Sequence, residues 1–561
     1  MRRIGIFLLI VIALFATAGP AAAQPKVTIS GLVDNITSYT HNISQTDLNP
    51  ARNRENEWYS RVRVRPDIIA EVGTTKFVLG LEIDETFGQT GNLGMAGPCG
   101  GVGSTVNGGL GAGTVCSSPQ RFGTTAGWAL NTDTQGIIEL KWAYTEVDVP
   151  LVPVPTRLRL GAQPFETQYK IATLATGDFA GAYVASQLTP MLRAKFTYAQ
   201  LEESSTGPKD GFIRGDDFAI ITSLEITPFK GLDIQPIFSY ANIIGVTTVS
   251  TRQARGGVGI GTGNFQTCPS NSLAGAANGC PVAGNGSAIE DRFTVGVDAR
   301  WRFGAFSLDP TVFYQFGSRD QMALVASRTS GPGVQTTLKR DAWYMDLRGG
   351  WQAGPLLLEL AGIYTTGNKA KDRIDLNRSR LKFYEPLDTD GSYFSGWGEI
   401  MANATTDYFN AFRASSASLR PTIQVGYDKY GLIIAGTRAS YALTPSFTLR
   451  AMASARWTAQ SVDTASTVAN ATGLTPRCSA LTLDNGSCVD RGTASYLGTE
   501  LDIGFQWRFA PNVALDFAAA YVFMGNAYSS PAITNITTGV VTNGRNPQDV
   551  QTIATRVRYT F

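Results

Sequence analysis

The sequence predicts an all-β fold: a single transmembrane antiparallel up-and-down β-barrel of about 18 strands, within a range of 16 to 20. Three observations predict it. Apolar and polar residues alternate along most of the chain, the connections between these segments are short and long in turn, and the chain begins with a stretch typical of export signals. In a barrel surrounded by lipid, such alternation places apolar side chains outside and polar ones inside.

Residues 1–23, MRRIGIFLLIVIALFATAGPAAA, predict a signal peptide. Two arginines precede an apolar run, and three alanines before Gln24 form an A-x-A cleavage site. An N-terminal membrane anchor is the alternative, but the apolar run is short for a spanning helix. We therefore expect residues 24–561 to form the barrel after export.

Charge balance argues against nucleic acid as a partner. The chain has 47 Lys+Arg and 45 Asp+Glu residues, and removal of the signal takes away two arginines, which leaves 45 of each sign. A neutral mature chain has no overall basic field that would attract phosphate backbones.

The six cysteines predict three disulfides in loops. They fall into local pairs in stretches rich in Gly, Ser and Asn: Cys99 with Cys116, Cys268 with Cys280, and Cys478 with Cys488. The pairing rests on proximity, because six cysteines allow several connectivities. A zinc site would need closely spaced cysteines or histidines, and the chain has only His41. We predict no metal and no other cofactor.

An early segment, YSRVRVRPD at 59–67, shows the alternation in its strongest form. Its three arginines alternate with Val62, Val64 and Pro66, so on a strand they share one face. The same period recurs in FTVGVDARWRF (293–303), FTLRAMASARW (447–457) and ELDIGFQWRF (500–509). In a barrel, the valines would face lipid and the arginines would face the lumen.

The connections supply the strand count. Tight turns rich in Pro, Gly and Asn are expected at 72–76, 150–156, 188–191, 227–231, 303–306, 353–355, 443–446 and 510–512. Long polar loops are expected at 41–57, 89–133, 164–179, 204–215, 246–290, 318–339, 367–430, 461–494 and 525–549. Eight turns and nine loops join 18 strands, and all three cysteine pairs fall in long loops. An extra hairpin around 421–431 is the alternative.

The end of the chain carries a resemblance to a known family. In IATRVRYTF, Val557, Tyr559 and the terminal Phe561 share one face, and Arg556 and Arg558 share the other. This segment resembles the last strand of Gram-negative outer-membrane porins, which ends in an aromatic residue that the barrel-assembly machinery reads. The stretch VTISGLVD (27–34) is similar to a porin first strand.

The resemblance implies a location in the outer membrane of a Gram-negative bacterium. Outer-membrane lipid, the barrel-assembly machinery and small hydrophilic solutes would then be the partners. The long loops would face outward, Phe561 would be the assembly signal, and the barrel would be a monomer or a homotrimer.

The alternation assigns many charged residues to the lumen. The basic ones are Arg61, Arg63, Arg65, Arg157, Arg159, Arg193, Lys195, Arg292, Arg300, Arg302, Arg348, Arg438, Arg450, Arg456, Arg508, Arg556 and Arg558. The acidic ones are Glu71, Glu82, Asp84, Glu225, Asp233, Asp298, Asp309, Asp346, Glu359, Glu500, Asp502 and Asp516. Two interpretations remain open: opposite charges brace the wall, or the arginines form a track that favours anions.

Segment 367–430 is predicted to fold into the lumen and narrow it. Cations and aromatic residues that suit acidic sugars gather there: Arg378, Arg380, Lys382, Phe383, Tyr384, Tyr393, Phe394 and Trp397. Over about 20 residues the segment is similar to alginate-export-type barrels, matched by Phe383, Leu387, Phe394 and Gly396, and it lacks a histidine common there. A surface loop without solute contact is the alternative.

The function predicted from these features is a passive channel for small hydrophilic solutes, with an arginine-rich lumen that biases it towards anions or acidic sugars. Ser–His chemistry would have to use His41, and one histidine beside Asn42 and Ser44 does not predict an enzyme. Two alternatives remain: a closed barrel that acts as an adhesin or structural surface protein through its disulfide-stapled loops, and a partner-gated polysaccharide exporter.

Overall fold

The computed structural model describes residues 26–42, 56–86, 128–131, 134–165, 167–170, 173–175, 178–202, 217–244, 289–323, 334–369, 372, 380–387, 397–401, 430–462, 467–470, 473–476, 494–528, 533–535, 541–542 and 547–561. The predicted signal peptide and all six cysteines of the predicted disulfides lie outside these residues.

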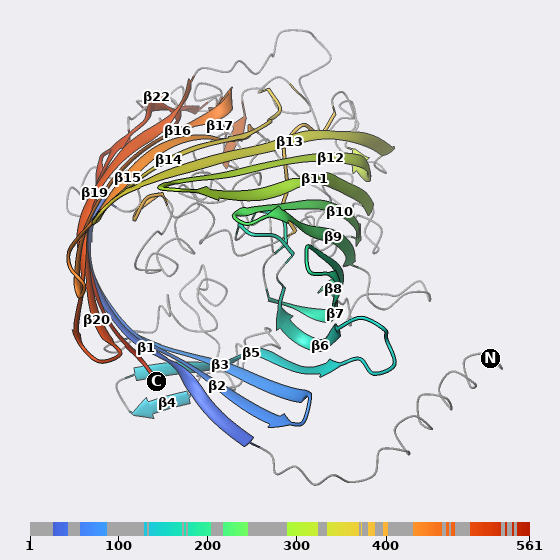
Figure 1. Ribbon diagram of the computed structural model, residues 1–561. Coiled ribbons are helices and arrows are strands. Elements are labelled where there is room, and N and C mark those ends of the chain that lie inside the picture. Colours follow the sequence, from blue (N-terminus) through green and yellow to red (C-terminus); the bar gives the residue numbers. More distant parts are fainter. Residues whose placement is uncertain are drawn as a thin grey trace.

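One antiparallel sheet closes on itself as a barrel of 18 strands (Figure 1). The strands are β1 (Lys26–His41), β2 (Asn56–Val72), β3 (Thr75–Thr86), β5 (Thr134–Asp148), β6 (Thr156–Pro164), β7 (Asp178–Thr189), β8 (Leu192–Glu202), β9 (Asp217–Phe229), β10 (Leu232–Ile244), β11 (Ile289–Phe303), β12 (Phe306–Ala323), β13 (Val334–Ala353), β14 (Leu356–Thr365), β15 (Ile433–Thr444), β16 (Phe447–Val462), β19 (Ala494–Ala510), β20 (Val513–Met524) and β23 (Val550–Thr560). The predicted fold class and strand count are confirmed.

The last strand closes the barrel against the first. Strand β23 pairs with both β20 and β1, and Ile36 of β1 lies opposite Arg556 of β23. The terminal Phe561 continues this seam, because its backbone N–H and C=O exchange hydrogen bonds of 3.0 and 2.9 Å with Gly31. The final residues that resemble a porin strand therefore complete the wall.

The connections follow the predicted pattern, with a few additions that the sequence did not indicate. Strand β14 pairs directly with β15, so no barrel strand among the described residues lies between them. The short β4 (Trp128–Asn131) pairs with β5 at the loop end. A separate small sheet joins two of the long connections through β17 (Thr467–Asn470), β18 (Gly473–Pro476), β21 (Ile533–Asn535) and β22 (Val541–Thr542).

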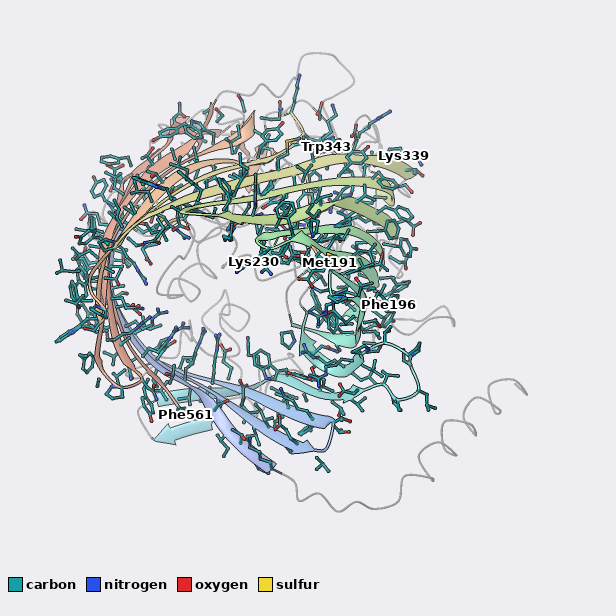
Figure 2. The ribbon with its side chains drawn as sticks, viewed as in Figure 1. Met191, Phe196, Lys230, Lys339, Trp343 and Phe561 are labelled. Carbon is teal, nitrogen blue, oxygen red and sulfur yellow. The ribbon has the colours of Figure 1, made fainter. Side chains whose placement is uncertain are left out.

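The barrel exposes apolar side chains on its outer surface and buries charged ones on its inner face, which is the reverse of a water-soluble domain. On β19, Leu501 and Ile503 are 47% and 64% exposed, whereas Glu500 and Asp502 are 0% and 6% exposed. Figure 2 shows side chains on both faces of the wall along the whole ring of strands. A continuous apolar outer surface is stable in lipid but not in water, so the barrel is built to span a membrane. No helix in the described part of the chain is long and apolar enough to do so.

Aromatic rings mark two levels on the outer surface. Near the short turns, Trp301 contacts Phe303 at a centroid distance of 4.4 Å, and Phe303 stacks on Phe306 at 5.7 Å. Near the long loops, Phe293 on the same strand stacks on Phe316 at 5.2 Å. Ten residues separate Phe293 from Phe303, which is about 33 Å along a strand and roughly 25 Å when the strand is tilted. That height matches the apolar band of a membrane barrel.

Candidate functional site: the inner wall

The half of the inner wall near the short turns carries ion pairs, most of them between neighbouring strands, here named the ion-pair ladder. Its members are Arg157 with Asp148 (3.0 Å), Arg159 with Glu146 (2.8 Å), Arg193 (3.7 Å) and Lys195 (3.1 Å) with Glu225, Arg300 with Asp233 (2.6 Å), Arg302 with Asp309, Arg348 with Asp346 (2.7 Å), Arg438 with Glu359, Arg556 with Asp516 (2.7 Å) and Arg558 with Asp34 (2.7 Å). Most of the arginines assigned to the lumen from the sequence therefore have carboxylate partners.

Strand register explains many of these pairs. Arg438 lies directly opposite Glu359 between β15 and β14, and Arg558 lies opposite Asp34 between β23 and β1. Directly opposite side chains in an antiparallel sheet begin about 5 Å apart, so an arginine and a carboxylate at such positions form an ion pair without backbone adjustment.

Two arginines of β2 bind the same carboxylate of the next strand. Glu82 accepts Arg63 at 3.1 Å and Arg65 at 2.8 Å, and Lys141 lies 3.7 Å from it. Arg61 is also buried on the inner face. Asp84 lies opposite Arg63 in the register, but its side chain lies outside what the structure describes. The expected group of β2 arginines beside a β3 carboxylate is present at Glu82.

Two arginines of the inner face have no carboxylate partner within the part of the chain that the structure describes: Arg450 and Arg508. Arg450 opens onto a recess of about 310 Å³ in the wall of β14, β15, β16 and β19. The other charged residues that line the recess are Arg438, Glu359, Glu399 and Asp502. A guanidinium without a carboxylate partner beside open space can form a bidentate contact with an anion.

A loop segment that the sequence did not single out packs against the inside of the wall. In residues 167–170, the backbone N–H of Tyr169 donates to Asp298 of β11 at 2.7 Å, and the ammonium of Lys170 lies 3.1 Å from the same carboxylate. The guanidinium of Arg300 lies over the Tyr169 ring at 4.3 Å. Burial and the neighbouring carboxylate of Glu225 raise the pKa of Tyr169, so this phenol stays protonated.

Segment 380–387, within the predicted constriction loop, is held by a buried group of charges, here named the charge cluster: Glu290, Arg292, Arg319, Arg340 and Glu385. Glu385 comes from the loop and the other four come from β11, β12 and β13. Burial alone would raise the pKa of Glu385, but the three arginines outweigh it and lower that pKa. The carboxylate is thus the ionised group that ties the loop to the wall.

Segment 397–401 is held by a second group, here named the wall clamp: Arg456, Glu500 and Asp502. Arg456 donates to the carbonyl oxygens of Met401 (2.7 Å) and Trp397 (2.8 Å). Glu500 accepts the backbone N–H groups of Ile400 and Met401, and Asp502 accepts that of Glu399. Three strand side chains therefore bind loop backbone directly.

The close fit of this segment depends on glycine. A Cβ on Gly398 would lie 2.4 Å from a Glu500 carboxylate oxygen, and a Cβ on Gly436 of β15 would lie 2.9 Å from the Trp397 ring. Because neither glycine has a side chain, Trp397 can lie against the wall. There the guanidinium of Arg438 lies 4.6 Å from the centre of the Trp397 ring.

Segment 380–387 also binds residues 173–175, which belong to the loop between β6 and β7. The hydroxyl of Tyr384 donates to the carbonyl of Thr173 at 2.6 Å, and the N–H of Leu387 donates to the carbonyl of Leu174 at 2.7 Å. Residues 173–175 and 380–387 thus form one layer on the inside of the barrel, linked to β11–β13 by the charge cluster.

The aromatic residues of the predicted constriction loop are packed into this layer. Phe383 and Tyr384 are 0% exposed and Trp397 is 1% exposed, so their rings contact protein. Arg380 and Lys382 are exposed, and Arg380 lies 3.6 Å from Asp341. Arg378, Tyr393 and Phe394 lie outside the described residues.

No group of three or more His, Cys, Asp or Glu residues that could hold a metal ion occurs in the described ranges.

Comparisons with known proteins find structural matches but no sequence matches. No protein-family model matches the chain, and no curated protein matches it. Among solved structures, OccK8 (OprE) of Pseudomonas aeruginosa matches with 11% identity and a TM-score of 0.43, over 96% of this chain and 98% of that chain. A BenF-like porin from Pseudomonas fluorescens Pf-5 has 9% identity and a TM-score of 0.43, with the same coverages. OpdQ of Pseudomonas aeruginosa has 8% identity and a TM-score of 0.41, over 95% and 98%. At this level of likeness the matches carry no information about solute or selectivity.

Proposed function

We propose that the chain is a channel of the Gram-negative outer membrane through which small hydrophilic solutes diffuse passively. The observation that carries the proposal is a closed barrel of 18 strands with an apolar outer surface and a charged inner wall. Barrels of 16 to 18 strands are too wide for wall side chains to fill, and leave room for water. Exposed charged residues on the ladder, such as Arg157 and Arg302, fit a hydrated lumen.

The proposed selectivity is a modest preference for anions that originates at Arg450. Ion pairs neutralise most of the wall arginines, so the ladder braces the barrel and adds little net field. Arg450 lacks such a partner among the described residues and faces open space. Segments 167–170, 173–175, 380–387 and 397–401, which pack on the inside of the wall, narrow the passage.

The closed-barrel adhesin and the partner-gated exporter remain the rival functions, and neither requires solutes to cross unaided. The proposal includes assembly through Phe561, a monomeric or homotrimeric barrel and disulfide-stapled outer loops.

The reversal potential of the refolded mature protein in a planar bilayer, under a tenfold KCl gradient, tests the proposal. We expect a stable open conductance with mild anion preference. Arg450→Gln should lower the anion-to-cation permeability ratio about twofold to threefold, because one unit charge about 14 Å from an ion in water attracts an anion and repels a cation by roughly 0.3 kcal/mol each. Lys230→Gln, which changes the same charge in an exposed turn, should leave the ratio unchanged.

Absence of conductance in the wild-type protein would rule out the open channel and favour the adhesin or the gated exporter. An open channel whose permeability ratio does not respond to Arg450→Gln would retain the channel and reject Arg450 as the origin of selectivity.

A further inference from the structure

A hollow lies on the outer, lipid-facing surface of the barrel, over β9–β13 and close to the long loops. Its volume is about 780 Å³. The lining residues are Ile220, Phe238, Tyr240, Asp291, Phe293, Phe316, Gly317, Ser318 and Lys339. The hollow lies on the opposite side of the wall from the ion-pair ladder.

Aromatic rings form the wall of the hollow. Phe293 lies at its centre and contacts Tyr240 at 5.0 Å, Phe316 at 5.2 Å and Phe238 at 6.4 Å between ring centroids. Phe238 and Phe316 are 41% and 36% exposed, so the rings leave apolar surface open on the outside of the barrel. A methylene chain is the kind of group that covers such a surface in a membrane.

A polar row borders the hollow on the side of the long loops. Register places Asn242, Asp291, Ser318 and Lys339 opposite one another across β10, β11, β12 and β13. The row lies directly beyond the aromatic row that contains Phe293, at the expected level of lipid headgroups.

The chemistry of the polar row is mixed. Lys339 is exposed, points away from the barrel interior (Figure 2), and has no ion-pair partner in the described ranges. One carboxylate oxygen of Asp291 accepts hydrogen bonds from Tyr240 (2.8 Å) and Asn242 (3.2 Å). The row therefore offers one unpaired cation together with a carboxylate and a hydroxyl.

We propose that this hollow binds a phosphorylated glycolipid of the outer leaflet. An acyl chain lies on the rings around Phe293, a phosphate contacts the ammonium of Lys339, and sugar hydroxyls donate to Asp291 and Ser318. Charge complementarity selects a phosphate for the unpaired lysine. The adjacent carboxylate favours a headgroup rich in hydroxyl donors over one that carries phosphate alone. The inference needs the barrel to lie in a membrane with its long loops outward, but it does not need conductance.

Native mass spectrometry of the full mature barrel in detergent tests the site. The probe is a bis-phosphorylated, multiply acylated glucosamine disaccharide, compared with its dephosphorylated form and with phosphatidylglycerol. We expect one tightly bound copy of the phosphorylated glycolipid. Lys339→Gln should weaken its binding about fivefold, in line with the usual effect of one basic residue at a membrane surface. Ser318→Trp, which places an indole ring among the residues that line the hollow, should weaken it further.

Lys230→Gln is the matched control, because it removes the same charge from an exposed turn at the opposite end of the barrel. It should leave binding unchanged, and circular dichroism should show that each variant keeps its β-sheet content. The dephosphorylated lipid should bind more weakly and should not respond to Lys339→Gln.

Three results would overturn the proposal. The first is equal binding of the phosphorylated glycolipid by wild type, Lys339→Gln and Ser318→Trp. The second is binding of phosphatidylglycerol with the same affinity and the same dependence on Lys339. The third is a stable oligomer that Ser318→Trp dissociates, which would make this surface a contact between copies of the chain.

Discussion

Arginines and carboxylates form both the ion-pair ladder near the short turns and the charge cluster near the long loops, but the two regions differ in burial. In the ladder, the side chains of Arg157 and Asp148 are 52% and 49% exposed. In the charge cluster, Arg340 and Glu290 are both 0% exposed. Other ladder pairs are more covered, down to 9% and 1% exposed for Arg556 and Asp516. The ladder therefore ranges from exposed to buried pairs, whereas these two residues of the charge cluster contact only protein.

This difference determines what each region does. Exposed ion pairs are screened and contribute between zero and about 1 kcal/mol each, so the ladder mainly sets the charge along the lumen. Loss of one partner from a buried group typically costs about 3–5 kcal/mol, because the remaining charges are left uncompensated. The charge cluster is thus a loop anchor, and the ladder is a lumen lining.

The largest expected effect comes from removal of a carboxylate from the charge cluster. Glu290→Gln leaves Arg292, Arg319 and Arg340 with Glu385 as their only cluster carboxylate, and should lower the free energy of unfolding by about 3–5 kcal/mol. This loss of stability is measured by unfolding the barrel in denaturant while circular dichroism monitors its β-sheet content. Asp148→Asn in the ladder is the matched control and should cost less than about 1 kcal/mol. Equal effects would remove the distinction between the two regions.

A smaller effect is expected at the wall clamp. Gly398→Ala places a Cβ 2.4 Å from Glu500, which should cost about 1–3 kcal/mol and displace segment 397–401 from the wall. Gly362→Ala is the control, because its Cβ would meet no atom within 4 Å. Limited proteolysis should cut the Gly398→Ala variant near this segment and leave the control intact. Resistance of both variants would show that the clamp tolerates displacement.

The smallest expected effect is a pH dependence of the layer at 380–387. The pKa of Glu385 is lowered from its ordinary value of 4.5, so its stabilisation is present above that pH and is lost as the pH falls through the lowered value. Hydrogen exchange at 380–387, corrected for intrinsic rates, should therefore increase below pH 4.5. Glu385→Gln should show faster exchange at neutral pH and little further change with acid. A wild-type profile that stays flat to pH 3 would contradict the anchor role of Glu385.

The sequence was informative about the barrel because lipid imposes local rules. An apolar outer face requires alternation within each strand, and a tight turn needs Pro, Gly or Asn within a few residues. Strand β19 and the turn after it could therefore be recognised without knowledge of their neighbours. Strand β4 and the small β17–β18 sheet were missed, since four-residue strands are too short to show a period.

By itself, the sequence determined the membrane-barrel fold and its strand count, and it assigned many charged residues to the inner face, but it missed Asp34, Glu146 and Glu290. Only the tertiary structure decided which of those charges are neutralised, which of them hold loops and where open space remains. Lys170 and Asp298 are 128 residues apart, and Arg340 and Glu385 come from a strand and a loop, so no local pattern links them. The outer hollow likewise exists because register aligns four strands. Contacts of this kind depend on closure of the whole barrel, which brings distant residues together after local patterns have formed the strands.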